Sequence, residues 1–176
     1  MDNISLKQVE IWADGAAIPN PGLGGFGVLL IHCVGEKEHR KEICGGFRHT
    51  TNNRMELMAV LQGLKMLKQR CKVNIHTDSQ YITNAFNLGR LKKWESKLWR
   101  DVKNVDLWQQ LLVVSEQHET SYIWVKGHNG HPEQERSDYL ANQGVVAKNL
   151  LIDFGYEQEL ARHNNAQNAQ ESLLTA

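Results

Sequence analysis

Four acidic residues occupy positions from which their side chains could bind metal ions. Asp14 and Asp78 each follow a strand-like stretch, Glu56 stands near the start of a helical pattern, and Asp138 lies within a later one. Each also has an ordinary structural explanation. Asp14 suits a turn and Asp78 suits a helix N-cap. Glu56 suits a capping box with Asn53, and Asp138 suits a solvated helix face.

Taken together, the four residues indicate a shared chemistry. If the strands before Asp14 and Asp78 are parallel neighbours, their carboxylates emerge at the same sheet edge, about 5 Å apart in backbone terms. Glu56 and Asp138 can reach that edge from their helices. Carboxylates this close repel one another, and hard cations such as Mg²⁺ or Mn²⁺ relieve that repulsion. Two such ions, roughly 3.5–4 Å apart, would stabilise the attacking and leaving oxygens of a phosphodiester.

The elements that would position these carboxylates can be read from residue periodicity. Alternating apolar residues predict strands over 7–13, 28–34, 41–47, 72–77 and 122–126. Apolar residues three and four apart predict helices over 53–67, 79–88, 105–117 and 133–149, with a further short helix in 90–103. This order predicts an α/β domain with a mixed five-stranded sheet, three strands antiparallel and two parallel, flanked by helices.

Length and composition indicate one domain and a tail. The chain has 176 residues, of which we assign 1–156 to the domain. Residues 157–176 are rich in Asn, Gln and Ala, so we expect a flexible tail. No apolar run approaches the ~18 residues of a membrane helix, and no signal-peptide pattern is present, so we expect a cytoplasmic protein.

The distribution of charge indicates a binding partner, and the cysteines bear on whether disulfides or a zinc site are present. The formal net charge is zero, but residues 90–103 hold six Lys or Arg residues against two acidic ones. Such a basic segment is typical of a nucleic-acid contact. The three cysteines are odd in number and widely spaced, which favours reduced core thiols over disulfides or a zinc site. They are Cys33, Cys44 and Cys71.

Two other motifs suggest functions that do not involve the carboxylates, namely dinucleotide binding and zinc binding. Residues 22–27 match G-x-G-x-x-G, but a predicted strand follows where a dinucleotide-binding motif requires a helix. We therefore interpret these glycines as serving a connection between strands. His128 and His131 lie three apart, yet no third soft ligand is near them in the sequence, so we do not expect zinc.

Over most of its length, from about Lys7 to Tyr156, the chain resembles type 1 ribonuclease H. Several blocks carry the resemblance, in one order and with family-like spacing. They are ADGA at 13–16, NPGLGGFG at 20–27, TTNNRMEL at 50–57, TDSQY at 77–81, VKNVDLW at 102–108 and WVKGHNGHPEQERSD at 124–138.

The resemblance implies an endonuclease that hydrolyses the RNA strand of RNA–DNA hybrids and leaves 5′-phosphate and 3′-hydroxyl ends. It implies four metal ligands, Asp14, Glu56, Asp78 and Asp138, holding two Mg²⁺ ions during catalysis, with Mn²⁺ as a substitute. It also implies a catalytic role for His128, whose imidazole can relay a proton.

Further positions are implied for substrate binding. Residues resembling those that read the RNA 2′-hydroxyls are Asn20, Asn52, Asn53, Glu56 and Gln80. A DNA phosphate would bind at Thr51 and Asn104, although His49 stands where family members often have an arginine. The segment 90–103 resembles a substrate-binding protrusion, in which Arg90 replaces a common tryptophan. Its contacts would be phosphates for Lys92, Lys93 and Lys97, and packing or stacking for Trp94 and Trp99.

Three other functions remain open at this point. One is a catalytically silent module that binds hybrids, although every position that carries the family chemistry is filled. Another is a different nuclease of the same superfold, which the 2′-hydroxyl-reading asparagines disfavour. The third, a nucleotide-dependent oxidoreductase, rests on the glycine motif alone. The resemblance implies a hybrid substrate, no membrane, no protein partner and a monomer.

Overall fold

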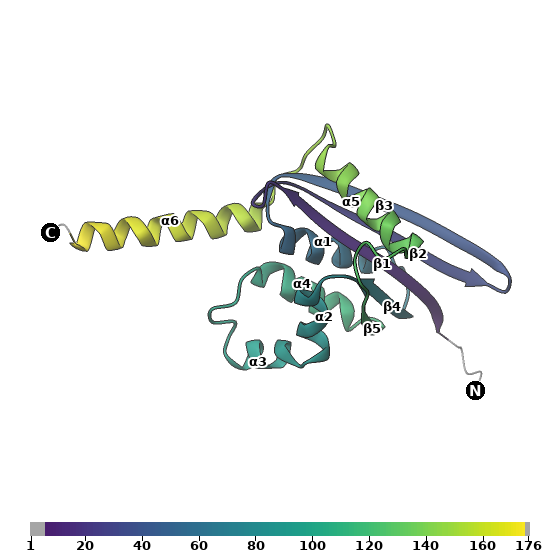
Figure 1. Ribbon diagram of the computed structural model, residues 1–176. Helices are drawn as coiled ribbons and strands as arrows, with labels where there is room; N and C mark the ends of the chain where they lie inside the picture. Colours follow the sequence, from purple (N-terminus) through teal and green to yellow (C-terminus); the bar gives the residue numbers. More distant parts are fainter. Residues whose placement is uncertain (1–5, 175–176) are drawn as a thin grey trace.

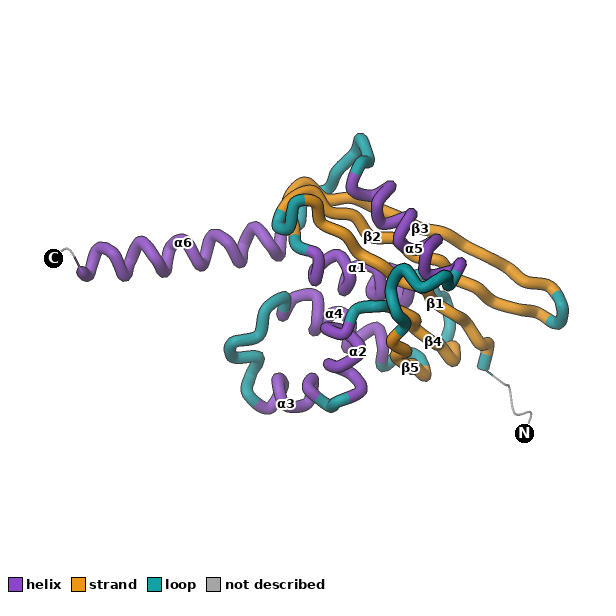
Figure 2. Tube along the Cα trace, in the orientation of Figure 1, coloured by secondary structure: helices purple, strands orange, loops and turns teal. Residues whose placement is uncertain are grey.

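A five-stranded mixed sheet forms the centre of the molecule in the computed structural model, which describes residues 6–174 (Figures 1 and 2). The strand order is β3-β2-β1-β4-β5. The strands are β1 (Lys7–Ile18), β2 (Gly22–Val34), β3 (Lys37–Thr50), β4 (Cys71–Thr77) and β5 (Glu119–Trp124). The first three pair antiparallel, and β4 pairs parallel with both β1 and β5. The predicted fold class is therefore confirmed.

Helices cover both faces of the sheet. On one face lie α1 (Asn52–Lys65), α2 (Gln80–Asn87), α3 (Arg90–Ser96) and α4 (Val105–Ser115). α1 packs on β1 and β2, where Gly63 lies against Ile11 and Val28. α5 (Pro132–Val145) covers β1, β2 and β3 from the opposite face. Because side chains alternate along β1, Val9, Ile11 and Ala13 enter the core, and Asp14 faces the α5 side.

The glycine motif of residues 22–27 belongs to β2, and no helix follows it. Its function is packing. A Cβ atom on Gly27 would overlap the carbonyl oxygen of Ser137 and the amide nitrogen of Ala141. α5 therefore rests directly on the backbone of β2, which requires residues without side chains at this point. The interpretation of the motif as structural is supported, and the glycines fix the height of α5 above the sheet.

The strands of the hairpin are longer than predicted, because β2 begins at Gly22 and β3 spans Lys37–Thr50. Glycines and charged residues at their ends hide the alternation in the sequence.

The prediction of three core thiols is wrong for two of them. Cys71 is buried, whereas Cys33 and Cys44 are exposed on the hairpin.

The C-terminal segment also differs from the prediction. Residues Phe154–Leu174 form a helix, α6, which begins inside the predicted domain and extends through most of the segment 157–176 that we expected to be a flexible tail. Its first turns contact the domain, and the helix then projects away from it (Figure 1). Residues 1–5 and 175–176, which the predicted domain and tail include, lie outside the described residues. Within 6–174, no helix has the length and apolar content needed to cross a membrane.

Candidate active site

Asp14 and Asp78 come together through the parallel pairing of β1 and β4. The last residues that these two strands pair with each other are Trp12 and His76, whose rings stack with centroids 4.0 Å apart. Each aspartate lies two residues beyond, and side chains repeat their direction every second residue of a strand. The two carboxylates therefore emerge from the same face at the same edge of the sheet, as the sequence predicted.

Glu56 reaches this edge from the beginning of α1. A Cβ atom on Gly15 would overlap the Glu56 amide nitrogen, so strand and helix backbones touch here. The Glu56 carboxylate accepts a hydrogen bond from Asn52 Nδ2 at 2.8 Å and another from the Ser79 hydroxyl. The N-cap of α1 is Thr51, so Glu56 is not part of a capping box with Asn53. Its side chain is oriented toward the sheet edge instead.

Asp138 approaches the cluster from α5, and His128 lies in the loop before that helix. Asp138 Oδ1 accepts a hydrogen bond from Asn142 Nδ2 at 3.0 Å, which holds the carboxylate from the next turn. His128 is exposed and has a positive φ of 51°. The N-cap of α2 is Ser79, so Asp78 does not fill the capping position that its sequence context allows.

The carboxylates are close enough to change each other's ionisation. Burial, followed by the charge of Asp78, raises the pKa of Asp14 to about 8, and Asp138 and Glu56 add to the effect. Burial also raises the pKa of Glu56 to about 7, with Asp78 contributing. The pKa of Asp78 is raised by burial and by Asp138, against the charge of His128. Mutual repulsion of this kind is what bound cations relieve.

The donor set of this cluster is all oxygen, which fits a hard divalent cation. As the side chains are placed in residues 6–174, no three His, Cys, Asp or Glu side chains converge tightly enough to coordinate an ion. Burial is the largest cause of the raised pKa values of Asp14 and Glu56, and the charges of neighbouring carboxylates raise both further. The residues present therefore fit a cation that replaces the protons held by Asp14 and Glu56 in its absence.

The predicted substrate-binding residues surround the same edge. Asn20, Thr51, Asn53 and Asn104 line one cavity of about 530 Å³. The backbone N–H of Asn52 donates a hydrogen bond to Asn20 Oδ1 at 3.1 Å. The loop before β2 is therefore joined to the start of α1. Gln80 is exposed at the first position of α2, next to the serine that binds Glu56. The fold thus brings together residues from four separate segments.

The basic segment forms α3 and the loop after it. Lys92, Lys93 and Lys97 are exposed, as phosphate contacts require. Trp94 and Trp99 are half-buried against the core, and the Trp94 ring centroid lies 5.3 Å from that of Trp108. Of the two roles expected for these tryptophans, packing is the one seen in the structure.

Sequence reasoning missed several residues around the cluster. Gln134, only 2% exposed, donates from Nε2 to Asp14 Oδ2 at 3.4 Å. Ser79 is 4% exposed and binds Glu56. Arg54 is buried and forms ion pairs with Asp106 and Asp153. Gln134, Ser79 and Arg54 all lie inside the family-like blocks, and that was the only signal in the sequence that could have indicated them.

Comparisons with known proteins agree with this arrangement. The family model described as RNase H matches residues 6–146. Ribonuclease H from Desulforamulus reducens is 48% identical over 156 residues, covering 86% of this chain and 96% of the relative. Ribonuclease H from Aeromonas hydrophila is 46% identical over 156 residues, covering 86% and 99%. A crystal structure of LC9-RNase H1, described as a type 1 RNase H with the type 2 active-site motif, superposes with a TM-score of 0.74 at 27% identity, covering 94% of this chain and 86% of that one.

The resemblance carried by the sequence blocks is thus confirmed by sequence and by structure. The chain belongs to the ribonuclease H family of enzymes.

Proposed function

We propose that this protein hydrolyses the RNA strand of RNA–DNA hybrids at the carboxylate cluster and leaves 5′-phosphate and 3′-hydroxyl ends. The observation that carries the proposal is the convergence of Asp14, Glu56, Asp78 and Asp138 from four different elements onto one sheet edge. Two Mg²⁺ ions, or Mn²⁺ in their place, would neutralise charge on the scissile phosphate and activate a water molecule. The residues of the chain itself would hold the ions, orient the substrate and exchange protons with it.

The four carboxylates act first as ligands. Asp14 lies on the middle strand of the sheet, and the charges of Asp78, Asp138 and Glu56 all add to the effect of burial in raising its pKa. Glu56 has an oxygen bound by Asn52 and the other by Ser79, so its orientation is fixed before any ion binds. Preorganised ligands avoid the cost of rearrangement when substrate arrives. His128, exposed on its loop, would relay a proton between the carboxylate cluster and solvent.

Substrate recognition uses the surrounding polar residues. Asn20, Asn52, Asn53 and Gln80, together with Glu56, lie where RNA 2′-hydroxyls would be read, and this selects RNA over DNA in the strand to be cut. Thr51 and Asn104 would hold a phosphate of the DNA strand. Lys92, Lys93 and Lys97, together with Trp94 and Trp99, would support the hybrid from the protrusion. The same proposal includes a domain over 1–156, a monomeric state without protein partners and a cytoplasmic location.

The decisive experiment compares substrates and metals. A labelled RNA–DNA hybrid should be cleaved in Mg²⁺ or Mn²⁺ and left intact in chelator. RNA–RNA and DNA–DNA duplexes of the same sequence should remain uncut in all conditions. End analysis of the fragments should show 5′-phosphates. Cleavage of DNA–DNA duplex at a comparable rate would favour another nuclease of this fold, and binding without cleavage would favour a silent module.

A further inference from the structure

The cavity that contains the proposed phosphate contacts has a second wall, made by α6. One side of its approximately 530 Å³ is lined by Asn20, Thr51, Asn53 and Asn104, which come from the loops around β1, α1 and α4. The other side is lined by Glu159, Leu160 and His163. α6 lies beyond residue 146, where the match to the family model ends. The match to the family therefore does not extend to Glu159, Leu160 and His163, and it assigns them no function.

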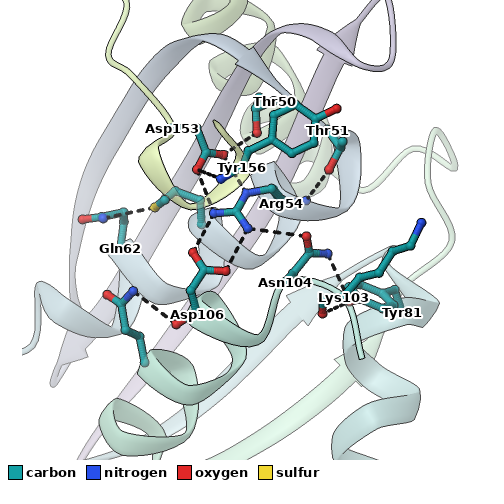
Figure 3. Close-up of polar contacts among 12 residues, drawn as sticks. Thr50, Thr51, Arg54, Gln62, Tyr81, Lys103, Asn104, Asp106, Asp153 and Tyr156 are labelled. Atoms are coloured by element: carbon teal, nitrogen blue, oxygen red, sulfur yellow. Dashed lines mark hydrogen bonds and ion pairs between the residues drawn. The ribbon is translucent and has the colours of Figure 1, made fainter. Parts of the chain in front are cut away.

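α6 is held against the cavity by a buried ion cluster (Figure 3). Arg54, 1% exposed, donates from Nε to Asp153 Oδ2 at 2.7 Å and from Nη2 to Asp106 Oδ2 at 2.7 Å. Asp153 in turn accepts from the Tyr156 amide at 3.2 Å, inside the first turn of α6. The Thr50 hydroxyl donates to Asp153 at 2.6 Å. The cluster thus joins the start of α6 to α1, β3 and α4.

Close packing fixes the direction in which α6 leaves this cluster. A Cβ atom on Gly155 would overlap Asp106 Oδ2, so the helix backbone rests on the carboxylate itself. Tyr156 is 8% exposed, and its ring meets that of His49 edge-on with centroids 5.1 Å apart. These contacts restrain the first turn, and the second turn then carries Glu159 and Leu160 to the cavity.

The charges that line the cavity nearly cancel. Among the described lining residues, Lys103 is the one permanently charged cation and Glu159 is the one carboxylate. The His49 ring packs edge-on against Tyr156 and is not among the residues that line the cavity. Glu159 lines the cavity together with Tyr156, and its charge adds to burial in raising the pKa of Tyr156 and of Tyr81.

A phosphate bound between Thr51 and Asn104 would lie beside this carboxylate. Two negative charges a few ångströms apart repel each other strongly when the water between them is limited, and dissolved salt weakens the effect. Removal of the carboxylate would leave Lys103 without an opposing charge. The cavity would then attract a phosphate more strongly than it does in the native protein.

We propose that α6 is part of the nucleic-acid-binding surface and that Glu159 is a counter-charge that limits how tightly this cavity holds a backbone phosphate. The inference rests on the proposed function, because the phosphate belongs to the bound hybrid. Its consequence is faster release: the helix lowers affinity at one end of the substrate and leaves the carboxylate cluster untouched.

The test measures binding of a fluorescent RNA–DNA hybrid in chelator, where cleavage does not occur. Glu159→Gln should lower Kd about three- to tenfold at low salt, and the gain should shrink as ionic strength rises. Glu157→Gln is the matched control, because Glu157 is exposed on the same helix and does not line the cavity. That control should change Kd less than about twofold, as a distant screened charge does.

A second variant removes the charge together with the rest of the helix beyond its first turn. A chain ending at Gln158 keeps Tyr156 but loses Glu159, so it should also bind the hybrid more tightly than the full chain. Equal Kd values for Glu159→Gln and Glu157→Gln, or weaker binding by the shortened chain, would overturn the inference. Failure of the unaltered protein to bind or cleave hybrid would instead overturn the proposed function, which keeps the two distinguishable.

Discussion

Gln134 of α5 donates a hydrogen bond from its side-chain amide to the carboxylate of Asp14 in β1, at 3.4 Å. The other oxygen of that carboxylate accepts from the Gly15 amide at 2.7 Å, so both are held by the protein. The Gln134 side chain is buried, and its Oε1 has no hydrogen-bond partner among the described residues. Gln134 therefore positions Asp14 at the expense of an unsatisfied buried acceptor.

Replacement of Gln134 with leucine should separate this positioning role from stability. Loss of the donor should lower kcat about tenfold, because the hydrogen bond to a charged group contributes roughly 1.5–3 kcal/mol. The free energy of unfolding should stay level or rise, because the unsatisfied Oε1 is removed as well. Gln143→Leu, at an exposed position of α5, is the control. The kcat-pH profile decides: an unchanged profile in Gln134→Leu would contradict a role through Asp14.

Asp78→Asn tests the carboxylate cluster directly. Ser79 caps α2, so no cap interaction is removed. We expect kcat in Mg²⁺ to fall at least about 10³-fold, equivalent to roughly 4 kcal/mol less transition-state stabilisation. Without metal, the variant should melt at the same or a higher temperature, because one member of a mutually repelling group is gone. A folded Asp78→Asn protein that keeps more than about a tenth of wild-type kcat would refute the assignment of this residue as a metal ligand.

The raised pKa values predict how pH and metal act together. In the folded protein Asp14 and Glu56 have pKa values of about 8 and about 7, above the ordinary 3.8 and 4.5. Between these limits the folded state binds more protons than the unfolded state, so metal-free stability should fall as pH rises from about 4 to about 8. Mg²⁺ binds the ionised groups, so its stabilising effect should grow over the upper part of the same range.

Melting temperatures with and without Mg²⁺, measured from pH 6 to pH 9, check this relationship. The increase in Tm caused by the metal should be larger at pH 9 than at pH 6. In Asp14→Asn most of that pH dependence should disappear, since the group with the highest pKa of the cluster is removed. A metal effect on Tm that is constant across the range would show that the protons of the cluster are not displaced by the ion.

The basic segment should contribute affinity and no chemistry, because its exposed lysines lie outside the carboxylate cluster. Replacing Lys92, Lys93 and Lys97 with alanine should raise KM several-fold with little change in kcat. The slope of log KM against log salt should flatten by up to about one unit for each phosphate that a lysine no longer neutralises. A variant with a normal salt slope would show that these lysines do not meet the hybrid.

Arg54 should be among the residues on which stability depends most. Arg54→Met leaves Asp153, 4% exposed, as a buried carboxylate without its cation. Removing one partner of a buried ion pair costs about 3–5 kcal/mol, so urea unfolding should show a decrease of that size. Arg54→Lys keeps the positive charge but lacks the forked geometry of the guanidinium group. It should therefore recover only part of the lost free energy of unfolding. A decrease below about 1 kcal/mol in Arg54→Met would mean that the cluster relaxes or admits water.

The carboxylate positions could be predicted from sequence because strand ends and helix starts are local features. The residue pattern placed Asp78 correctly, just after β4, and it brought Asp14 to the same sheet edge, although β1 continues past the predicted end at residue 13 to Ile18 and Asp14 lies inside it. The contact of Gln134 with Asp14 could not be predicted in the same way. It depends on how closely α5 approaches the sheet, and that distance is set by backbone contacts with Gly27 from a remote part of the chain.

The prediction for residues 157–176 shows a different limit. Their low apolar content excludes a large buried face, which led us to expect a tail without regular structure. Helix formation does not require such a face, because Gln, Glu and Ala have favourable helix propensity. Here the first turn is set by Asp153 and Tyr156, both buried, and elongation from a fixed turn avoids the cost of nucleation.

The order of the elements along the chain has a consequence for synthesis. Asp14, Glu56 and Asp78 all precede α5, which brings both Asp138 and Gln134 to the cluster. During translation, the N-terminal elements leave the ribosome first. Until α5 emerges and settles on Gly27, three carboxylates face water beside an uncovered strip of sheet. The fourth carboxylate and the hydrogen bond that orients Asp14 are added in the same step. The unfinished chain therefore lacks the complete set of ligands while the ribosome still holds it on its own messenger RNA.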